Sequence, residues 1–151
     1  MEKCYPELFK PFKIGKVEIK NKVVMSPMLT IGWFEEQSVF SDKMIDYYTE
    51  RAKGGVGAVF TCGNVPDAHL ERCPFTISPF AKPERFVEQC GKLADSLHKY
   101  GAKLFVQVWF GLGRVAFSEF MQDQPVAVSE GPNRWKPEVT CRAMTTEEIY
   151  G

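Results

Sequence analysis

Over the first 109 residues of this chain, short apolar runs of strand length alternate with segments whose apolar residues recur at helical spacing. No other feature of the sequence restricts its fold as much. The runs at 22–28, 56–61 and 102–109 have the length of buried strands. Apolar residues recur at helical spacing between the first and second runs, and again between the second and third. Parallel neighbouring strands need crossover helices, so this order predicts an α/β fold with a parallel sheet.

Both helical stripes carry start and stop signals. Ser41 is a favourable N-cap residue, and Gly54-Gly55 supplies a stop. Pro83 suits the first turn of the second helix, which Gly101 closes. The residues expected to face the core are Met44, Ile45, Tyr48 and Ala52 in the first stripe, and Phe86, Val87, Cys90, Leu93, Ala94 and Leu97 in the second.

The chain before the first helix predicts a small β-hairpin and one core strand. Two alternating stretches around Gly15-Lys16 predict a hairpin over 9–19. The run at 22–28 is stopped by Pro27 and suits a strand buried on both faces. We expect loops at 30–40 and 65–81, where glycine, aromatic residues or proline accumulate.

The C-terminal third lacks any helical stripe from 115 to 143 and offers one short strand at 125–129. Such long excursions are usually functional segments or lids. Thr145-x-x-Glu148 is a capping box, so a helix should begin there. An α/β barrel needs about 250 residues. We therefore expect one incomplete domain over 1–151, cut off after the third βα unit.

Charge and hydropathy exclude several classes of function. The chain carries 19 Lys+Arg and 19 Asp+Glu, so its formal net charge is zero and nucleic acid is not an expected partner. No apolar run approaches the roughly 18 residues of a membrane span. The N-terminus lacks a signal-peptide pattern, so we expect a cytoplasmic protein without membrane contact.

The cysteines and histidines predict no disulfide framework and no metal site. The five cysteines are Cys4, Cys62, Cys73, Cys90 and Cys141. They are widely spread without a C-x-x-C pattern, which favours reduced thiols. His98 lies near a helix C-terminus, where a dipole or surface role is expected, and His69 falls in the loop after the second strand.

Three clusters follow the predicted strands and should converge, because sites of parallel α/β folds lie at the carboxyl ends of the strands. They are 26–30, 62–64 and 107–114. They offer backbone that can approach a flat ring, the neutral amide of Gln107 and the cation of Arg114. No nucleophile triad is visible, and Gly111-Leu-Gly113 lacks the third glycine of a dinucleotide fingerprint. The pattern indicates a binding surface.

Each of these residues also has a structural interpretation. Pro27 and Gly63 would serve equally as strand terminators, and Arg114 as a solvated surface charge. Gln107 is harder to explain in that way, because an amide buried in a Val/Phe/Val strand needs hydrogen-bond partners. A bound cofactor would provide them.

Three motifs in order resemble the Old Yellow Enzyme family of flavin oxidoreductases. They are Leu8-Phe-Lys-Pro-Phe-Lys-Ile-Gly15 followed by Lys20-Asn-Lys-Val-Val-Met-Ser-Pro-Met28, then Tyr47-Tyr-Thr-Glu-Arg-Ala-Lys-Gly-Gly-Val-Gly57, and Leu97-His-Lys-Tyr-Gly-Ala-Lys-Leu-Phe-Val-Gln107. Met144 to Ile149 matches a further family signal, so the resemblance covers nearly the whole chain.

The resemblance implies the N-terminal portion of an (α/β)8 TIM barrel that binds FMN at its C-terminal mouth, with the hairpin closing the bottom. Pro27, Met28 and Leu29 would meet the N5/O4 edge of the flavin. Gly63 would lie by the pyrimidine side, and Gln107 would hydrogen-bond its O2/N3 region. The implied activity is hydride transfer from NAD(P)H through FMN to an activated C=C bond of a small enoate, enone or dienoyl substrate.

The sequence departs from the common family pattern at two places. Gln107-Val-Trp-Phe-Gly-Leu-Gly-Arg114 lacks the family's His and looks more like the 2-enoate and dienoyl-CoA reductase branch. Leu29 stands where other members carry a Cys or Thr beside the flavin. The family's catalytic residues would lie beyond residue 151, as would the 4Fe-4S cluster and FAD of that branch.

Two further hypotheses stay open. The chain could be a catalytically inactive partial barrel that self-associates into a homo-oligomer or needs a complementary chain, because an open sheet edge favours association. A TIM barrel acting on a phosphorylated substrate has no positive residue support in this sequence.

Overall fold

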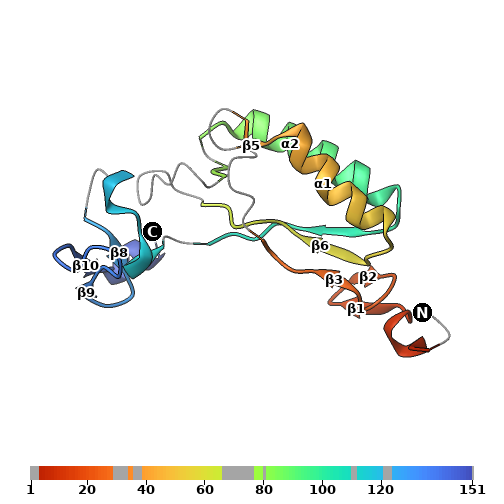
Figure 1. Ribbon diagram of the computed structural model, residues 1–151, viewed down its shortest axis with the longest axis horizontal. Helices are drawn as coiled ribbons and strands as arrows, with labels where there is room; N and C mark the ends of the chain where they lie inside the picture. The colour runs from red at the N-terminus through yellow and green to blue at the C-terminus, as the bar shows by residue number, and fades with distance from the viewer. Residues whose placement is uncertain are drawn as a thin grey trace.

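The protein centres on a three-stranded parallel sheet with two helices on one face (Figure 1). The computed structural model describes residues 4–28, 34–35, 39–65, 77–79, 81–109, 112–120 and 124–150. The sheet order is β3-β6-β7, with bounds Val24–Met25, Ala58–Phe60 and Lys103–Phe105. Its register pairs Met25 with Val59 and Val59 with Leu104. The predicted α/β class is confirmed.

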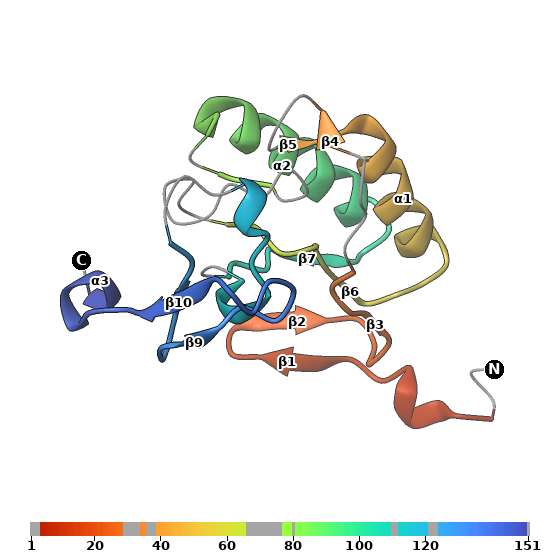
Figure 2. The same cartoon turned by 60° about the vertical axis from the view of Figure 1, so that its left-hand side comes forward.

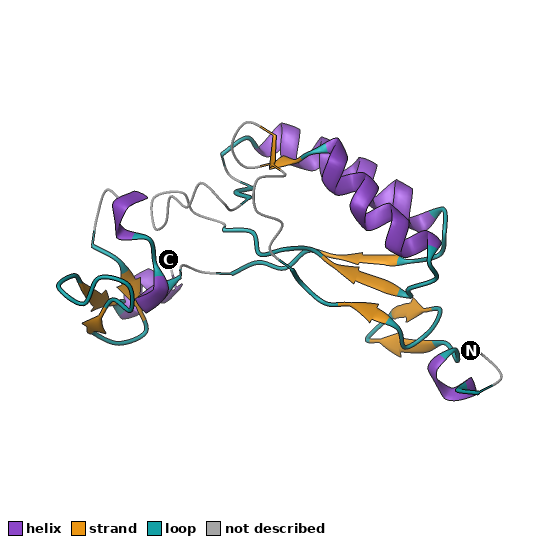
Figure 3. Ribbon diagram, viewed as in Figure 1, coloured by secondary structure: helices purple, strands orange, loops and turns teal. Residues whose placement is uncertain are grey.

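The other elements are η1 (Pro6–Leu8), β1 (Phe12–Ile14), β2 (Val17–Ile19), β4 (Phe34–Glu35), β5 (Val39–Phe40), α1 (Asp42–Lys53), α2 (Pro83–His98), η2 (Gly113–Val115), η3 (Ser118–Phe120), β8 (Val126–Ala127), β9 (Gly131–Pro132), β10 (Thr140–Ala143) and α3 (Thr146–Tyr150). The hairpin of β1 and β2 and the short helix η1 lie at one end of this sheet, and the elements that follow residue 112 form a separate group (Figures 2 and 3). β4 and β5 pair antiparallel inside the segment expected to be a loop. Of the helices described, none combines the length and apolar character that a membrane crossing requires.

Helix α1 forms as its sequence predicts. The Ser41 hydroxyl accepts a hydrogen bond from Met44 N at 3.2 Å, which caps the first turn. The buried residues of α1 are the predicted Met44, Ile45, Tyr48 and Ala52. At the other end, Gly54 is the C-cap and Gly55 takes the left-handed conformation, with φ of 103°.

Helix α2 has the predicted bounds but a different buried ridge. Gln89, Leu93 and Leu97 are buried at i, i+4, i+8 spacing, whereas Val87 is 69% exposed. Val87 stands two residues from the ridge, which turns it about 200° away on a helix of 3.6 residues per turn. The prediction that Val87 faces the core is therefore wrong. α2 lies beside α1, where Thr49 Oγ1 donates to Ser96 Oγ at 2.8 Å.

The two faces of the parallel sheet differ. Val59 is fully buried toward the helices, and Met25 and Leu104 join it there. The opposite face carries Phe60 and Phe105, whose half-buried rings stack with centroids 4.7 Å apart. No helix among the described residues covers that face.

The expectation that the run at 22–28 is buried on both faces is wrong. β3 is an edge strand of the described sheet, and Val24 on it is exposed. Met28, just beyond β3, is 51% exposed. An edge strand with one uncovered face keeps water contact that a central strand such as β6 loses.

The predicted N-terminal hairpin closes the amino-terminal end of the sheet (Figure 1). Gly15, with φ of 57°, makes the turn, and Ile19 on β2 is fully buried. Asn21 Nδ2 donates to Gly55 O at 2.8 Å, and Asn21 Oδ1 accepts from Val23 N at 3.1 Å. Both ends of this side-chain amide are therefore satisfied.

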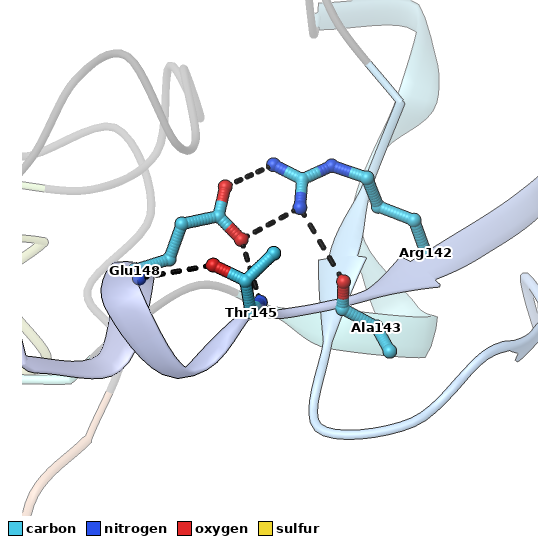
Figure 4. Close-up of polar contacts among 4 residues, drawn as sticks. All are labelled: Arg142, Ala143, Thr145 and Glu148. Carbon is cyan, nitrogen blue, oxygen red and sulfur yellow. Dashed lines mark hydrogen bonds and ion pairs between the residues drawn. The ribbon is translucent and has the colours of Figure 1, made fainter.

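The C-terminal segment forms a small lobe of its own rather than the one short strand expected. Its sheet order is β8-β10-β9, parallel between β8 and β10 and antiparallel between β10 and β9. The predicted capping box is present, with Glu148 N donating to Thr145 Oγ1 at 3.2 Å (Figure 4). Arg142 on β10 also donates two hydrogen bonds to the Glu148 carboxylate, at 2.8 and 2.5 Å. The pair ties α3 to β10.

Candidate functional site

The carboxyl ends of the three parallel strands lie at one edge of the sheet, as expected for an α/β site. The register brings Pro27 and Met28, beyond β3, to the same edge as Gly63 and Gln107. Pro27 and Met28 are exposed there. The predicted Leu29 lies outside the described residues.

The Gln107 side chain is exposed at this edge, so the interpretation of a buried amide is wrong. The regular ladder of β7 ends at Phe105, and Val106, Gln107 and Val108 beyond it are exposed. Its backbone is nevertheless fixed, because Gln107 N donates to Thr61 Oγ1 at 3.2 Å and Gln107 O accepts from Asn64 N at 2.9 Å. An exposed amide on a fixed backbone is suited to binding a ligand.

A buried polar network connects the end of β6 to the end of β7. Asn64, fully buried, donates through Nδ2 to Thr61 Oγ1 at 3.1 Å, to Cys62 O at 2.8 Å and to Gln107 O at 2.8 Å. Trp109 N donates to Asn64 O at 3.0 Å. Sequence reasoning missed this role of Asn64, although a polar Thr-Cys-Gly-Asn run directly after an apolar strand was its available signal.

Gly63 allows the indole of Trp109 to approach the backbone. A Cβ at Gly63 would stand 2.9 Å from Trp109 Cε2, closer than real Cβ contacts, and 3.1 Å from Nε1. The Trp109 indole was also missed from sequence. Its Nε1 and Asn64 Oδ1 are buried without hydrogen-bond partners in the part of the chain that the structure describes.

The Cys62 thiol beside this network is not a nucleophile at neutral pH. Burial raises its pKa to about 11. Cys62 N donates to the Tyr48 hydroxyl at 3.0 Å, and burial raises the pKa of Tyr48 as well. Both groups stay protonated near pH 7 and serve packing.

The predicted cation Arg114 belongs to the C-terminal lobe. It is exposed, and its Nε donates to Pro132 O at 2.9 Å. The structure therefore gives Arg114 a contact within the lobe. His98 is exposed in the last turn of α2, whereas His69 lies outside the described residues. Within the described ranges, no group of three His, Cys, Asp or Glu side chains could hold a metal ion.

Among the described residues, the strand ends thus combine a neutral exposed amide, a glycine and two buried polar atoms without partners, and they hold no acid, base or nucleophile activated for reaction near pH 7. Such a set fits a flat, neutral heteroaromatic ring with its own donors and acceptors. The flavin implied by the sequence resemblance has that character. These residues would bind and orient the ring.

The sequence matches known proteins over almost its full length. A cinnamate reductase from Clostridium sporogenes is 38% identical over 151 residues, which cover 99% of this chain and 23% of that protein. An NADH oxidase from Thermoanaerobacter brockii is 34% identical over 132 residues, covering 85% of this chain and 19% of that protein. The chain therefore spans about a quarter or less of the length of these curated relatives.

A solved structure shares the fold. The Old Yellow Enzyme homologue from Zymomonas mobilis superposes with a TM-score of 0.75 at 27% identity, over 96% of this chain and 41% of that chain. Residues 7–150 match the model of the NADH:flavin oxidoreductase / NADH oxidase family. These findings confirm the resemblance drawn from the three motifs. The chain belongs to the NADH:flavin oxidoreductase / NADH oxidase family of oxidoreductases, to which its Old Yellow Enzyme-like motifs had pointed.

Proposed function

We propose that this chain is the N-terminal, flavin-facing part of a (β/α)8 barrel of an FMN-dependent ene-reductase. One observation carries the proposal: the Gln107 amide is exposed at the carboxyl edge of the sheet while its backbone is fixed at both N and O. That arrangement suits hydrogen bonding to the pyrimidine O2/N3 region of FMN. Gly63 would lie by the same side of the ring.

The other assignments follow the strand order. Pro27 and Met28 lie at the end of β3, adjacent to β6, so they and Leu29 would meet the N5/O4 edge. FMN, when bound, supplies the hydride chemistry, with NAD(P)H as reductant. The residues of this chain bind the ring, orient it and cover part of its pyrimidine side.

The identity to a cinnamate reductase supports the 2-enoate reductase branch and an activated alkene conjugated to a carboxylate or related carbonyl as substrate. The motif from Gln107 to Arg114, without the family's His, agrees with that branch. We place its 4Fe-4S cluster and FAD, like the groups that protonate and anchor the substrate, outside these 151 residues.

The test is an FMN titration of the purified chain, followed by the visible flavin band. We expect saturable binding that Gln107→Leu weakens about tenfold, the effect of losing roughly one hydrogen bond. Gln124→Leu is the matched control, because Gln124 is also exposed but donates to Thr140 O within the C-terminal lobe. Equal affinity of the two variants would contradict the role of Gln107.

A second candidate function is association through the open sheet. The half-buried Phe60 and Phe105 rings and the exposed Val24 on edge strand β3 favour it. Light scattering of the chain should then show concentration-dependent mass, which Val24→Lys reduces because an edge lysine blocks strand addition. A monomer at every concentration would contradict this candidate.

A further inference from the structure

We infer that Asn64 is a positioning residue for the cofactor: its buried amide fixes the carboxyl ends of β6 and β7 and thereby sets the place of the Gln107 side chain. The inference rests on the proposed function. Asn64 itself has no exposed surface, so it acts through Gln107 without touching the ring.

The hydrogen bonds define how Asn64 acts. Gln107 O accepts from both Asn64 N, at 2.9 Å, and Asn64 Nδ2, at 2.8 Å. Gln107 N donates to Thr61 Oγ1, which also accepts from Asn64 Nδ2 at 3.1 Å. Both backbone polar groups of Gln107 are therefore held by Asn64, one directly and one through Thr61. Only the side-chain amide of Gln107 stays available at the surface.

The chemistry of the network requires a donor at residue 64. Three oxygens, from Thr61, Cys62 and Gln107, converge on Nδ2, whereas Oδ1 is buried without a partner among the described residues. Burying an unpaired carbonyl oxygen costs free energy. A residue that served packing alone would not carry that cost, so we attribute it to holding the strand ends.

Asn64→Asp tests the donor with almost no change of shape. The new carboxylate would present oxygen to three oxygens, which should displace Gln107 and weaken FMN about tenfold at pH 8. A buried carboxyl group has a raised pKa, and its protonated form can donate one hydrogen bond. FMN affinity of this variant should therefore recover as pH falls, measured at pH values where circular dichroism shows the variant to be folded.

Asn21→Asp is the matched control. Asn21 is also a buried amide that donates to a backbone carbonyl, but it lies at the amino-terminal end of the sheet. That variant should lower the melting temperature and leave the FMN dissociation constant within about twofold. If Asn64→Asp does not fold, Thr61→Val removes the hydroxyl that holds Gln107 N and should weaken FMN in the same direction.

The double variant separates this inference from the proposed function. If Asn64 acts through Gln107, adding Asn64→Asp to Gln107→Leu changes the FMN dissociation constant by less than about twofold. An Asn64→Asp variant that binds FMN as tightly as the unsubstituted chain, while Gln107→Leu binds it weakly, overturns the inference and leaves the proposed function standing. An unchanged affinity of Gln107→Leu overturns both.

Discussion

Two buried asparagines lie at opposite ends of the same sheet. The same residue type stabilises the closed amino-terminal end and positions ligand-binding groups at the open carboxyl end. Asn21, at the amino-terminal end, pairs both its Nδ2 and its Oδ1 with backbone groups. Asn64, at the carboxyl end, shares one Nδ2 among three oxygens and leaves Oδ1 without a partner among the described residues. The arrangement at Asn21 stabilises the fold. The arrangement at Asn64 leaves one carbonyl oxygen unpaired and fixes the backbone that carries the exposed Gln107 side chain.

The neighbours of the two asparagines differ in the same way. Beside Asn21, the fully buried Ile19 and the backbone of Gly57 fill the end of the sheet. Beside Asn64, the Gln107 side chain is exposed, and Gly63 is covered by a side chain, the Trp109 indole. In parallel α/β folds the amino-terminal end serves stability and the carboxyl end serves function. The two ends should therefore respond differently to substitution.

The largest effect is expected at the closed end, from Gly57→Ala. The new Cβ would stand 2.6 Å from Asn21 O and 2.9 Å from Ile19 Cγ2, and Asn21 O belongs to the backbone that joins β2 to β3. Overpacking of this kind costs up to about 3 kcal/mol. Urea unfolding of the variant should show that loss, and a loss below about 0.5 kcal/mol would mean that this end is not tightly closed.

Gly63→Ala makes the equivalent change at the open end. The Cβ would stand 2.9 Å from the Trp109 ring, which can rotate aside where a backbone cannot. We expect a smaller loss of stability, about 1 kcal/mol, together with a changed indole fluorescence and weaker FMN binding. If this variant were destabilised as much as Gly57→Ala, the contrast between the two ends would not hold.

Removing the amide at the closed end has a moderate effect. Asn21→Ala leaves Gly55 O and Val23 N without their partner, at a cost of about 1–2 kcal/mol. Thermal melting should show the loss, whereas the FMN dissociation constant of the folded variant should not change. A clear loss of affinity would show that the two ends are coupled.

The smallest effect is expected far from both ends, at the partly buried Arg142–Glu148 pair that ties α3 to β10. The Arg142 guanidinium first, and the Thr145 N–H second, lower the pKa of Glu148 from 4.5 to about 2. A lowered folded-state pKa contributes stability that is complete above about pH 4.5 and is lost as pH falls toward 2. Glu148→Gln should remove the contribution of this carboxylate to the pH dependence of the melting temperature between about pH 2 and 4.5. The FMN affinity at pH 7 should not change. If the melting temperature of Glu148→Gln depended on pH between 2 and 4.5 as that of the unsubstituted chain does, the Arg142–Glu148 pair would not form in solution.

The sequence was most informative where local signals agree with tertiary packing. Ser41, the apolar stripe and Gly54-Gly55 predict α1 with its buried residues, because cap, period and stop coincide. For α2, the apolar residues are compatible with more than one choice of buried face. Only packing against neighbouring elements determines that Gln89 is buried and Val87 is exposed.

The candidate site was less predictable than the fold. The strand ends at Gly63 and Gln107 follow from the order of elements, but the burial of Gln107 was mispredicted because its apolar neighbours resemble a core strand. Asn64 acts through bonds to residues up to 43 positions away, which no local pattern encodes. The strands of the C-terminal lobe are two to four residues long and depend on long-range pairing, so only β8 was foreseen.

Hydrogen exchange of the chain with and without FMN shows which end of the sheet binds the cofactor. We expect FMN to slow exchange of the amides at 61–64 and 105–109 and to leave 19–24 and 55–58 unchanged, because the cofactor binds the carboxyl end of the sheet alone. Equal slowing at both ends, or slowing confined to 19–24 and 55–58, would contradict the assignment of the flavin site to the carboxyl ends of β6 and β7.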